Sequence, residues 1–541
     1  MKIVCAYLCE YRERDDYFIS LMPSGVASIA SYLEREGHSV TLANLSEFGA
    51  EKGAAITIKE KPDAVTVSIF SFNRHESCSY INELKKRNKD LIIIAGGQHP
   101  TFLAEQVFSS CPELDYIVSG EGEIAASKIL ASPEKIKKGS VIREERIKDL
   151  DSIPCASDFS GKMIGVNPHE QFRYIITTRG CPSSCTYCSS PYFWERKVTY
   201  RSPENIVNEL KFIQEKYGII YFSIRDDNFT LNKKRVMEFC RLLNESGIYM
   251  MWNCQARVDT IDIDMLTAMK SCGLEHIQFG IESGSERILK LYEKSTSIKK
   301  IKRASEATRK AGVYLSFYLM AGMHGETEKD IDKTVSLMHS TLPHDSIVSP
   351  VAYYPGTALY SSALKEKKIN HGIWQEKNDS GLYLIDKKIS DRWIKKLLRE
   401  SIRVSSKAIY RARDFSMFRK NENGGLWLTA ILEGDYYLES GNVEKALLNY
   451  RKVIEEHPEN IWGYLKSAEA LYDISPDEAI KLLQKTTKIV PSYNGALYSI
   501  ARLEYECGNI KSALKHAEKA LKLNPYDTEI KSFIQQIRNC C

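Results

Sequence analysis

The chain has 541 residues, which is too long for a single hydrophobic core and predicts about three domains. Hydrophobic residues make up 43% of it and charged residues 27%, as in an ordinary globular protein. Lysine and arginine (75) exceed aspartate and glutamate (70) by five charges, so the charge does not favour nucleic acid or a membrane surface as partner. The apolar runs are too short to span a membrane. The 14 cysteines are mostly scattered singly, as expected in a reducing cytoplasm.

Short apolar strands alternate with amphipathic helices in the first part of the chain. This alternation is typical of βαβ units, which build a parallel sheet that binds ligands at the carboxyl ends of its strands. We therefore predict an α/β, Rossmann-like (flavodoxin-like) domain over 1–135, followed by a lysine-rich linker over 136–170. The predicted strands are 3–8, 39–43, 64–69, 91–95 and 116–118, and the predicted helices include 24–36 and 76–87.

A loop with three cysteines follows an apolar run at 172–177. Cys181, Cys185 and Cys188 have the spacing CxxxCxxC. This spacing can place three thiolates around one corner of a [4Fe–4S] cluster and leave the fourth iron without a protein ligand. The alternative is a zinc site, in which Cys155 or His169 would supply the fourth ligand, because no second CxxC pair is present.

A second series of strands and helices begins near residue 172. The predicted strands are 172–177, 219–224, 249–255, 276–281, 314–321 and 346–353. The predicted helices between them are 204–217, 233–246, 263–272, 298–311 and 328–340. We interpret this series as a partial (βα)6 barrel over 171–364, with the cysteine loop after its first strand.

The cysteine loop and the segments after the later strands resemble the radical S-adenosylmethionine (SAM) superfamily. In that family the open iron binds the amino and carboxylate groups of SAM. An electron from the cluster then splits a carbon–sulfur bond and releases a 5′-deoxyadenosyl radical. The SAM-binding residues that the resemblance implies are Tyr187, Asp226, Asp227, Arg257, Glu282, Ser283 and Gly322.

Several of these residues also have an ordinary structural explanation. Asp226 and Asp227 can accept hydrogen bonds from the ammonium of SAM, or cap the following helix. Arg257 can pair with the carboxylate of SAM or form a surface salt bridge. Glu282 matches the family pattern better than Glu326 does.

The N-terminal α/β region resembles the cobalamin-binding domain that precedes the barrel in many radical SAM enzymes. Glycines at a strand end let the backbone approach a flat ligand closely, although a glycine pair alone is more often a tight turn. The chain contains no DxHxxG motif, so the cobalt-binding histidine of methionine-synthase-like domains is missing. His99 is either a cobalt ligand or a packed loop histidine. The cobalamin-binding residues that the resemblance implies are Ser68, Gly96, Gly97, Gln98, His99 and Gly120.

The last part of the chain changes to helices with an internal period. Residues 365–424 are charged and predicted to form a helical bridge. Beyond it, Pro458, Pro491 and Pro525 recur after 33 and 34 residues, as do Ala446, Ala479 and Ala513. This period resembles tetratricopeptide repeats. We expect 425–541 to form an all-α array of three repeats with a terminal helix, to fold alone, and to bind a protein partner.

Together these patterns predict a cytoplasmic, cobalamin-dependent radical SAM enzyme with a [4Fe–4S] cluster, SAM and cobalamin as cofactors. The expected reaction is methyl transfer to an unactivated carbon or phosphorus of an unknown substrate, either a small molecule or a protein-linked one. The cluster would receive its electron from a donor such as flavodoxin or ferredoxin. Two alternatives stay open: radical cyclisation or rearrangement without methyl transfer, and an iron–sulfur redox sensor or scaffold that acts through its repeats. No residue identifies the substrate.

Overall fold

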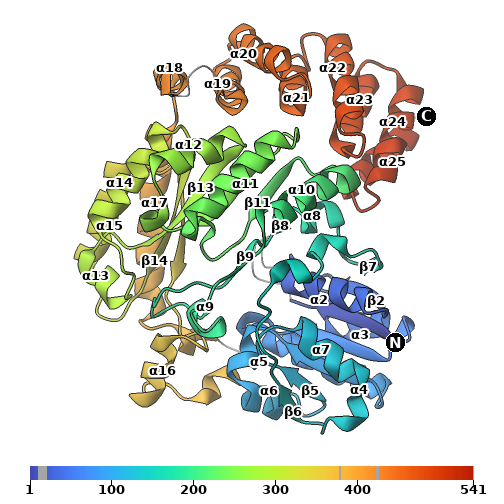
Figure 1. The fold of residues 1–541 in the computed structure, drawn as a ribbon, viewed down its shortest axis with the longest axis vertical. Helices are drawn as coiled ribbons and strands as arrows, with labels where there is room; N and C mark the ends of the chain where they lie inside the picture. The colour runs from blue at the N-terminus through green and yellow to red at the C-terminus, as the bar shows by residue number, and fades with distance from the viewer. Residues whose placement is uncertain (10–20, 377–378, 422–425, 540–541) are drawn as a thin grey trace.

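The structure is a computed structural model that describes residues 1–9, 21–376, 379–421 and 426–539. Two parallel sheets with their helices lie next to each other, and a helical array covers the far end of the second sheet (Figure 1). The predicted border between bridge and repeats, at 424 and 425, lies outside the described residues. Among those that are described, no helix combines the length and the apolar character needed to cross a bilayer.

The N-terminal sheet has seven strands in the order β6-β5-β4-β3-β1-β2-β7, paired in parallel. Its strands are β1 (Lys2–Tyr7), β2 (Ser39–Asn44), β3 (Ala64–Ser68), β4 (Ile92–Gly96), β5 (Tyr116–Val118), β6 (Ser140–Ile142) and β7 (Lys162–Ile164). The main helices that cover it are α2 (Ser24–Arg35), α3 (Gly49–Lys59), α4 (Arg74–Arg87), α6 (Ala104–Ser110) and α7 (Glu123–Ala131).

The segment 136–170, interpreted from the sequence as a linker, adds a strand to each edge of this sheet. β6 pairs with β5, and β7 pairs with β2. Both strands have three residues, all of them at least partly exposed. Edge strands this short carry no apolar run, so the hydrophobic pattern did not reveal them.

One disulfide departs from the expectation of single thiols. Cys78 on α4 is bonded to Cys111, the residue that follows α6, with 5.4 Å between their Cα atoms. The two residues lie 33 positions apart in the sequence and meet because both pack into one buried cluster on the same sheet.

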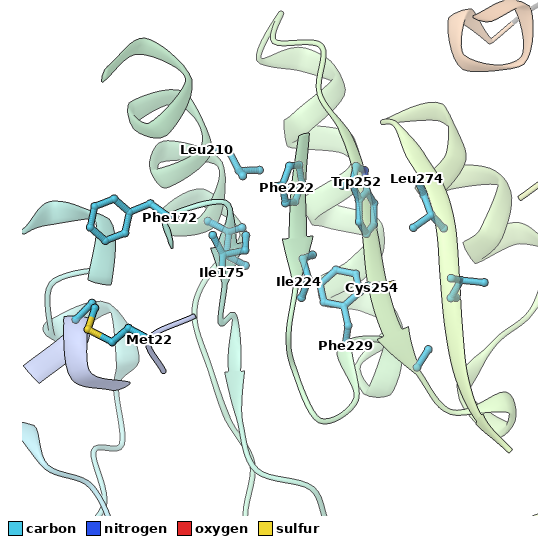
Figure 2. Packing of buried hydrophobic residues seen from close by; sticks show 14 of the residues in the cluster. Met22, Phe172, Ile175, Leu210, Phe222, Ile224, Phe229, Trp252, Cys254 and Leu274 are labelled. Carbon is cyan, nitrogen blue, oxygen red and sulfur yellow. The ribbon is translucent and has the colours of Figure 1, made fainter. Parts of the chain in front are cut away.

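The second sheet has six parallel strands in the order β15-β14-β13-β12-β11-β8, as the predicted (βα)6 barrel requires. The strands are β8 (Tyr174–Ile175), β11 (Tyr221–Ile224), β12 (Met251–Ala256), β13 (Leu274–Glu282), β14 (Tyr314–Ala321) and β15 (Asp345–Pro350). The helices are α10 (Pro203–Tyr217), α11 (Lys233–Glu245), α12 (Ile263–Ser271), α14 (Ile298–Lys310), α15 (Glu328–Thr341) and α17 (Lys387–Ala408). Figure 2 shows part of the core between sheet and helices, with Phe222, Trp252 and Leu274 on neighbouring strands.

Helix α17 lies within the segment interpreted as a bridge, yet it belongs to the barrel. Its Trp393 and Leu397 are buried in the same cluster as Trp252. It packs on β15 and α15 and so takes the place of the sixth barrel helix. The charged residues that suggested a bridge lie on its solvent face, as in any amphipathic surface helix.

The C-terminal array consists of successive antiparallel helices. They are α19 (Trp427–Glu439), α20 (Val443–Glu456), α21 (Ile461–Ala470), α22 (Pro476–Ile489), α23 (Asn494–Glu506), α24 (Ile510–Leu523) and α25 (Thr528–Asn539). The periodic residues Ala446, Ala479 and Ala513 are fully buried. Their small side chains allow the paired helices to approach closely, which explains the 33- and 34-residue period.

The array docks on the amino ends of the barrel strands. Tyr249, just before β12, packs against Trp427 of α19, with 5.8 Å between ring centroids. The Ser492 hydroxyl donates to the carbonyl of Gln214 at 2.7 Å. His169 also contacts the array, because its Nε2 lies 3.1 Å from the carbonyl oxygen of Leu523. The repeats are therefore packed on the barrel.

Two glycines that end neighbouring barrel helices offer a matched test of this docking. Gly218 ends α10 with φ +64°, and a Cβ added there would lie 2.3 Å from the carbonyl oxygen of Ser492. Gly247 follows α11 with φ +73°, and an added Cβ would have no atom within 4 Å. Gly247→Ala should cost about 1 kcal/mol of backbone strain, whereas Gly218→Ala should cost about 2–4 kcal/mol because a clash is added. Thermal unfolding measures the difference, and equal shifts would contradict the docking.

Candidate functional site

The two sheets turn their carboxyl ends towards one cavity of about 390 Å³. The N-terminal domain supplies the residues after β3, β4 and β5, and the barrel supplies those after β8 and β11. Of the predicted cobalamin-binding residues, the wall includes Ser68, Gly96, Gly97, Gln98 and Gly120. Carboxyl ends of parallel strands are where α/β sheets bind ligands, so the cavity lies where both domains would bind theirs.

Glycines form the part of the wall that a flat ligand would approach. Gly97 has φ +105°, and an added Cβ would lie 2.7 Å from the carbonyl oxygen of Ile69, so only glycine fits there. Gly120 has φ +87°, and no atom lies within 4 Å of an added Cβ. The wall is thus bare backbone at these points, which fits a bulky, flat cofactor such as cobalamin.

His99 is not part of the cavity wall. Its side chain is buried, with Nδ1 2.9 Å from the Ser71 hydroxyl and its ring against Trp374. Burial, helped by the charge of Arg74, lowers the pKa of His99 to about 3. The structure therefore places His99 in the packed arrangement, the second of the two alternatives.

The cysteine loop leaves β9 (Thr178–Arg179) and returns to β10 (Thr199–Tyr200), and these two strands pair. Cys181 and Cys185 are buried, and Cys188 is half-buried. Asp226 fixes the start of the loop, because its carboxylate accepts hydrogen bonds from the backbone N–H of Thr177 (2.6 Å) and Thr178 (3.0 Å). Asp226 is fully buried, so it supports the loop rather than facing a ligand.

The two residues that could complete a zinc site are engaged elsewhere. The Cys155 thiol is 3.0 Å from Nη2 of Arg201, and His169 contacts the helical array. Within the described part of the chain, no group of three or more His, Cys, Asp or Glu side chains gathers as a single metal ion would require. Neither Cys155 nor His169 is therefore placed as a free fourth ligand for zinc.

Three of the predicted SAM-binding residues meet beside the cysteine loop. The Tyr187 hydroxyl donates to Oε1 of Glu282 at 2.9 Å. Arg257 points Nη1 towards the Cys185 sulfur at 3.8 Å. Burial and the charge of Glu282 raise the pKa of Tyr187 well above its usual value. These side chains can bind the polar end of a ligand held at the loop.

Lys294 completes this group, and the sequence analysis missed it. Its Nζ lies 2.8 Å from Glu282, and both side chains are almost fully buried. Lys294 follows a short helix, α13 (Glu286–Leu291), in a stretch where Glu293 and Ser295 have positive φ. A lone lysine in such a stretch is usually on the surface, so no sequence pattern singled it out.

The other predicted SAM-binding residues lie apart from this group. Asp227 lines the cavity and accepts a hydrogen bond from the Ser190 hydroxyl at 2.6 Å. Ser283 is fully buried and lies against Thr334. Gly322 has φ +103° and donates its N–H to Glu326 at 2.7 Å. Burial raises the pKa of Glu326 to about 7.

Polar contacts from the N-terminal domain hold both flanks of the cysteine loop. Arg179, just before the loop, forms buried ion pairs with Glu121 and Glu123, each at 2.6 Å. The Gln98 amide donates to the Ser189 hydroxyl at 2.8 Å, directly after the last cysteine. Burial opposes the charge of Arg179, but the two carboxylates outweigh it and raise the pKa of the guanidinium.

The pair of Lys294 and Glu282 predicts a large effect on stability. Lys294→Met leaves the Glu282 charge buried and uncompensated, which should cost about 3–5 kcal/mol of unfolding free energy. Lys294→Met combined with Glu282→Gln should recover part of this loss. Lys310→Met, which breaks the exposed pair with Glu306, serves as a control and should change little. Denaturant unfolding checks the series, and a double variant no more stable than Lys294→Met would contradict it.

The fold and the site define a class: two α/β domains whose sheets share one cavity at their carboxyl ends, with a loop of three cysteines in the second domain. Residues 175–338 match the model of the radical SAM superfamily, and residues 20–130 match the B12 binding domain. The chain is therefore a radical SAM enzyme with an N-terminal B12-binding domain. This confirms the resemblance inferred from the sequence.

Similar proteins span most of the chain. An uncharacterized methyltransferase of Pyrococcus horikoshii is 27% identical over 403 residues, covering 70% of this chain and 86% of its own. The anaerobic magnesium-protoporphyrin IX monomethyl ester cyclase of Rubrivivax gelatinosus is 25% identical, covering 59% of this chain and 62% of its own. Among solved structures, the cobalamin-dependent SAM radical enzyme OxsB with aqua-cobalamin bound superposes with a TM-score of 0.58 at 16% identity, covering 99% of this chain and 84% of OxsB. This last likeness concerns the fold.

Proposed function

We propose that the chain is a cobalamin-dependent radical SAM methyltransferase that acts on an unactivated carbon or phosphorus of its substrate. The observation that carries the proposal is the single cavity that the glycines of the B12-binding domain share with the barrel residues beside the cysteine loop. The methyltransferase relative supports the transfer of a methyl group. When bound, the cluster and SAM supply a radical and cobalamin supplies a methyl group.

The residues of this chain have distinct roles in the proposal. Cys181, Cys185 and Cys188 hold the cluster. Arg257 and Glu282 bind the polar end of SAM, and Lys294 holds the Glu282 carboxylate in place through their buried ion pair. Because these groups are buried, water is largely kept from the reacting centre, which strengthens each charged contact.

The cavity glycines would carry cobalamin. Gly97 and Gly120 leave the backbone bare, and Gln98 links this wall to the cysteine loop through Ser189. We also propose a cytoplasmic protein that receives its electron from a donor such as flavodoxin or ferredoxin and binds a protein partner through its repeats. The buried helix pairs of the array support the last point, because such arrays leave a broad outer surface for binding.

The release of S-adenosylhomocysteine tests the methyl transfer. Anaerobic protein with a reduced cluster should release about one S-adenosylhomocysteine per bound cobalamin, since one SAM would donate the methyl group that cobalamin carries. A second SAM, the source of the radical, would leave 5′-deoxyadenosine and methionine instead. Protein reconstituted without cobalamin should release none. The second candidate, radical cyclisation or rearrangement, is favoured by the cyclase relative. It predicts 5′-deoxyadenosine without S-adenosylhomocysteine, and that result would overturn the methyltransferase proposal.

A further inference from the structure

The barrel sheet has two faces of different character. Along β12, Trp252 and Cys254 point to the helices and are fully buried, whereas Asn253 and Gln255 point the other way and are half-buried. The same alternation holds on the strands beside it, because side chains of a strand alternate between faces. The face away from the helices, here called the inner face, carries mainly polar side chains, namely Ser223, Asn253, Gln255, His276, Gln278, Ser316 and Tyr318, with Met320 and Ile347 as apolar members.

Three of these side chains, on adjacent strands, form one hydrogen-bonded group, here called the Gln255–Tyr318–Gln278 row. Gln255 is in register with Gln278, whereas Tyr318 of β14 is in register with Gly280, two residues further along β13, and its hydroxyl bonds to both glutamines. The Tyr318 hydroxyl donates to Oε1 of Gln278 at 2.9 Å and accepts from Nε2 of Gln255 at 3.2 Å. The two hydrogen bonds to Tyr318 use Nε2 of Gln255 and Oε1 of Gln278. They leave out the other amide atoms, the acceptor Oε1 of Gln255 and the donor Nε2 of Gln278. The row therefore leaves one acceptor and one donor, on in-register residues of neighbouring strands, for a ligand.

The side chain that precedes Gln278 on the inner face, His276, is uncharged at neutral pH. Burial and the nearby Arg225 lower the pKa of His276 to about 4, so its imidazole is neutral. Glu275 lies at the amino end of β13 and Arg225 after the carboxyl end of β11. Asp345 of β15 is in register with Ser316 of β14, which is in register with Gln278. The paired charges of Glu282 and Lys294 reach the position of Gly280. An apolar ligand laid across this face would leave the amide groups without partners, which is costly in a half-buried site.

We propose that the Gln255–Tyr318–Gln278 row binds a neutral, planar part of the substrate that presents a donor and an acceptor side by side, as a nucleobase or an amide does. An amide pair held in this way matches such an edge bidentately. Large hydrocarbons and porphyrins do not present an outer edge with a donor and an acceptor side by side. The inference rests on the proposed function, because it names the class of substrate that the methyl group would reach.

Equilibrium dialysis of the full chain with three probes tests the row, and it needs neither cluster nor cobalamin. The probes are cytidine, N-acetylglycinamide and protoporphyrin IX. We expect saturable binding of cytidine and weaker binding of N-acetylglycinamide. Tyr318→Phe should weaken cytidine binding about tenfold, because the hub that orients both amides is lost. Gln255→Leu should do the same by removing the acceptor.

Tyr498→Phe is the matched control, since its hydroxyl contacts Glu529 in the helical array instead. This variant should bind cytidine as the wild type does. Three results would each overturn the proposal. The first is that neither cytidine nor N-acetylglycinamide binds, and the second is that Tyr318→Phe and Tyr498→Phe lose the same affinity for cytidine. The third is that protoporphyrin IX binds more tightly than cytidine. If N-acetylglycinamide binds and cytidine does not, the row still binds a donor–acceptor edge, and the substrate presents that edge on an amide and not on a nucleobase. Release of S-adenosylhomocysteine is measured separately, so failure of the methyltransferase proposal would be recognised independently.

Discussion

Replacing Cys181, Cys185 and Cys188 together with alanine should remove all cluster iron from anaerobically reconstituted protein. Wild-type protein should carry about four irons per chain, because three thiolates at this spacing hold one [4Fe–4S] cluster. Iron and sulfide analysis, together with the visible absorbance, measures the loss. Each single replacement should also abolish the cluster, since a loop with two remaining thiolates cannot hold it.

Cys240→Ala provides the control for this experiment. Cys240 is buried in the barrel core on α11, so its loss leaves a small cavity without touching the loop. Its iron content should match that of the wild type. Iron that persists in the triple variant would assign the cluster to other residues, and a wild type that holds one zinc instead would restore the zinc alternative.

Filling the cavity should weaken cobalamin binding without affecting the cluster. Gly25 lies in the first turn of α2, lines the cavity and has no atom within 4 Å of an added Cβ. Gly25→Phe should therefore place an aromatic ring in the cavity and weaken hydroxocobalamin binding by at least about tenfold, as expected for a steric clash of a few kcal/mol. Equilibrium dialysis measures the affinity, and iron content in the same sample reports whether the barrel is intact.

Glu36→Phe adds the same ring at an exposed position at the end of α2. It should bind hydroxocobalamin normally. Unchanged affinity in Gly25→Phe would show that cobalamin binds outside this cavity, and an equal loss in both variants would point to a general effect of the added ring.

The strands and helices that build the two sheets could be predicted because their apolar periods are strong. Strands such as β4 are continuous apolar runs, and the helices between the strands are amphipathic. Two features were missed for opposite reasons. β6 and β7 are too short and exposed to show a pattern, whereas α17 has a pattern that its many surface charges obscured.

The site was predicted best where a local spacing carries the chemistry. The three cysteines are close in sequence, so their spacing alone predicted a loop that can bind a cluster. Lys294 and the Arg179 ion pairs depend on contacts between distant segments, which single-sequence reasoning does not reveal. Asp226 and Ser283 lie in the segments that the resemblance indicated, yet both are fully buried, because they bond to Thr177 and Thr334 in distant segments.

The docking of the repeats sets the distance over which a tethered substrate would have to travel. The array covers the amino ends of the barrel strands, while the cysteine loop lies at their carboxyl ends. The longest strand, β13, has nine residues and spans roughly 30 Å. A carrier protein bound to the repeats would need a linker of roughly 30 Å to bring an attached substrate to the cysteine loop. With a shorter linker, the attached substrate would stay at the amino ends of the barrel strands, away from the cysteine loop, and the partner would only hold the enzyme in place.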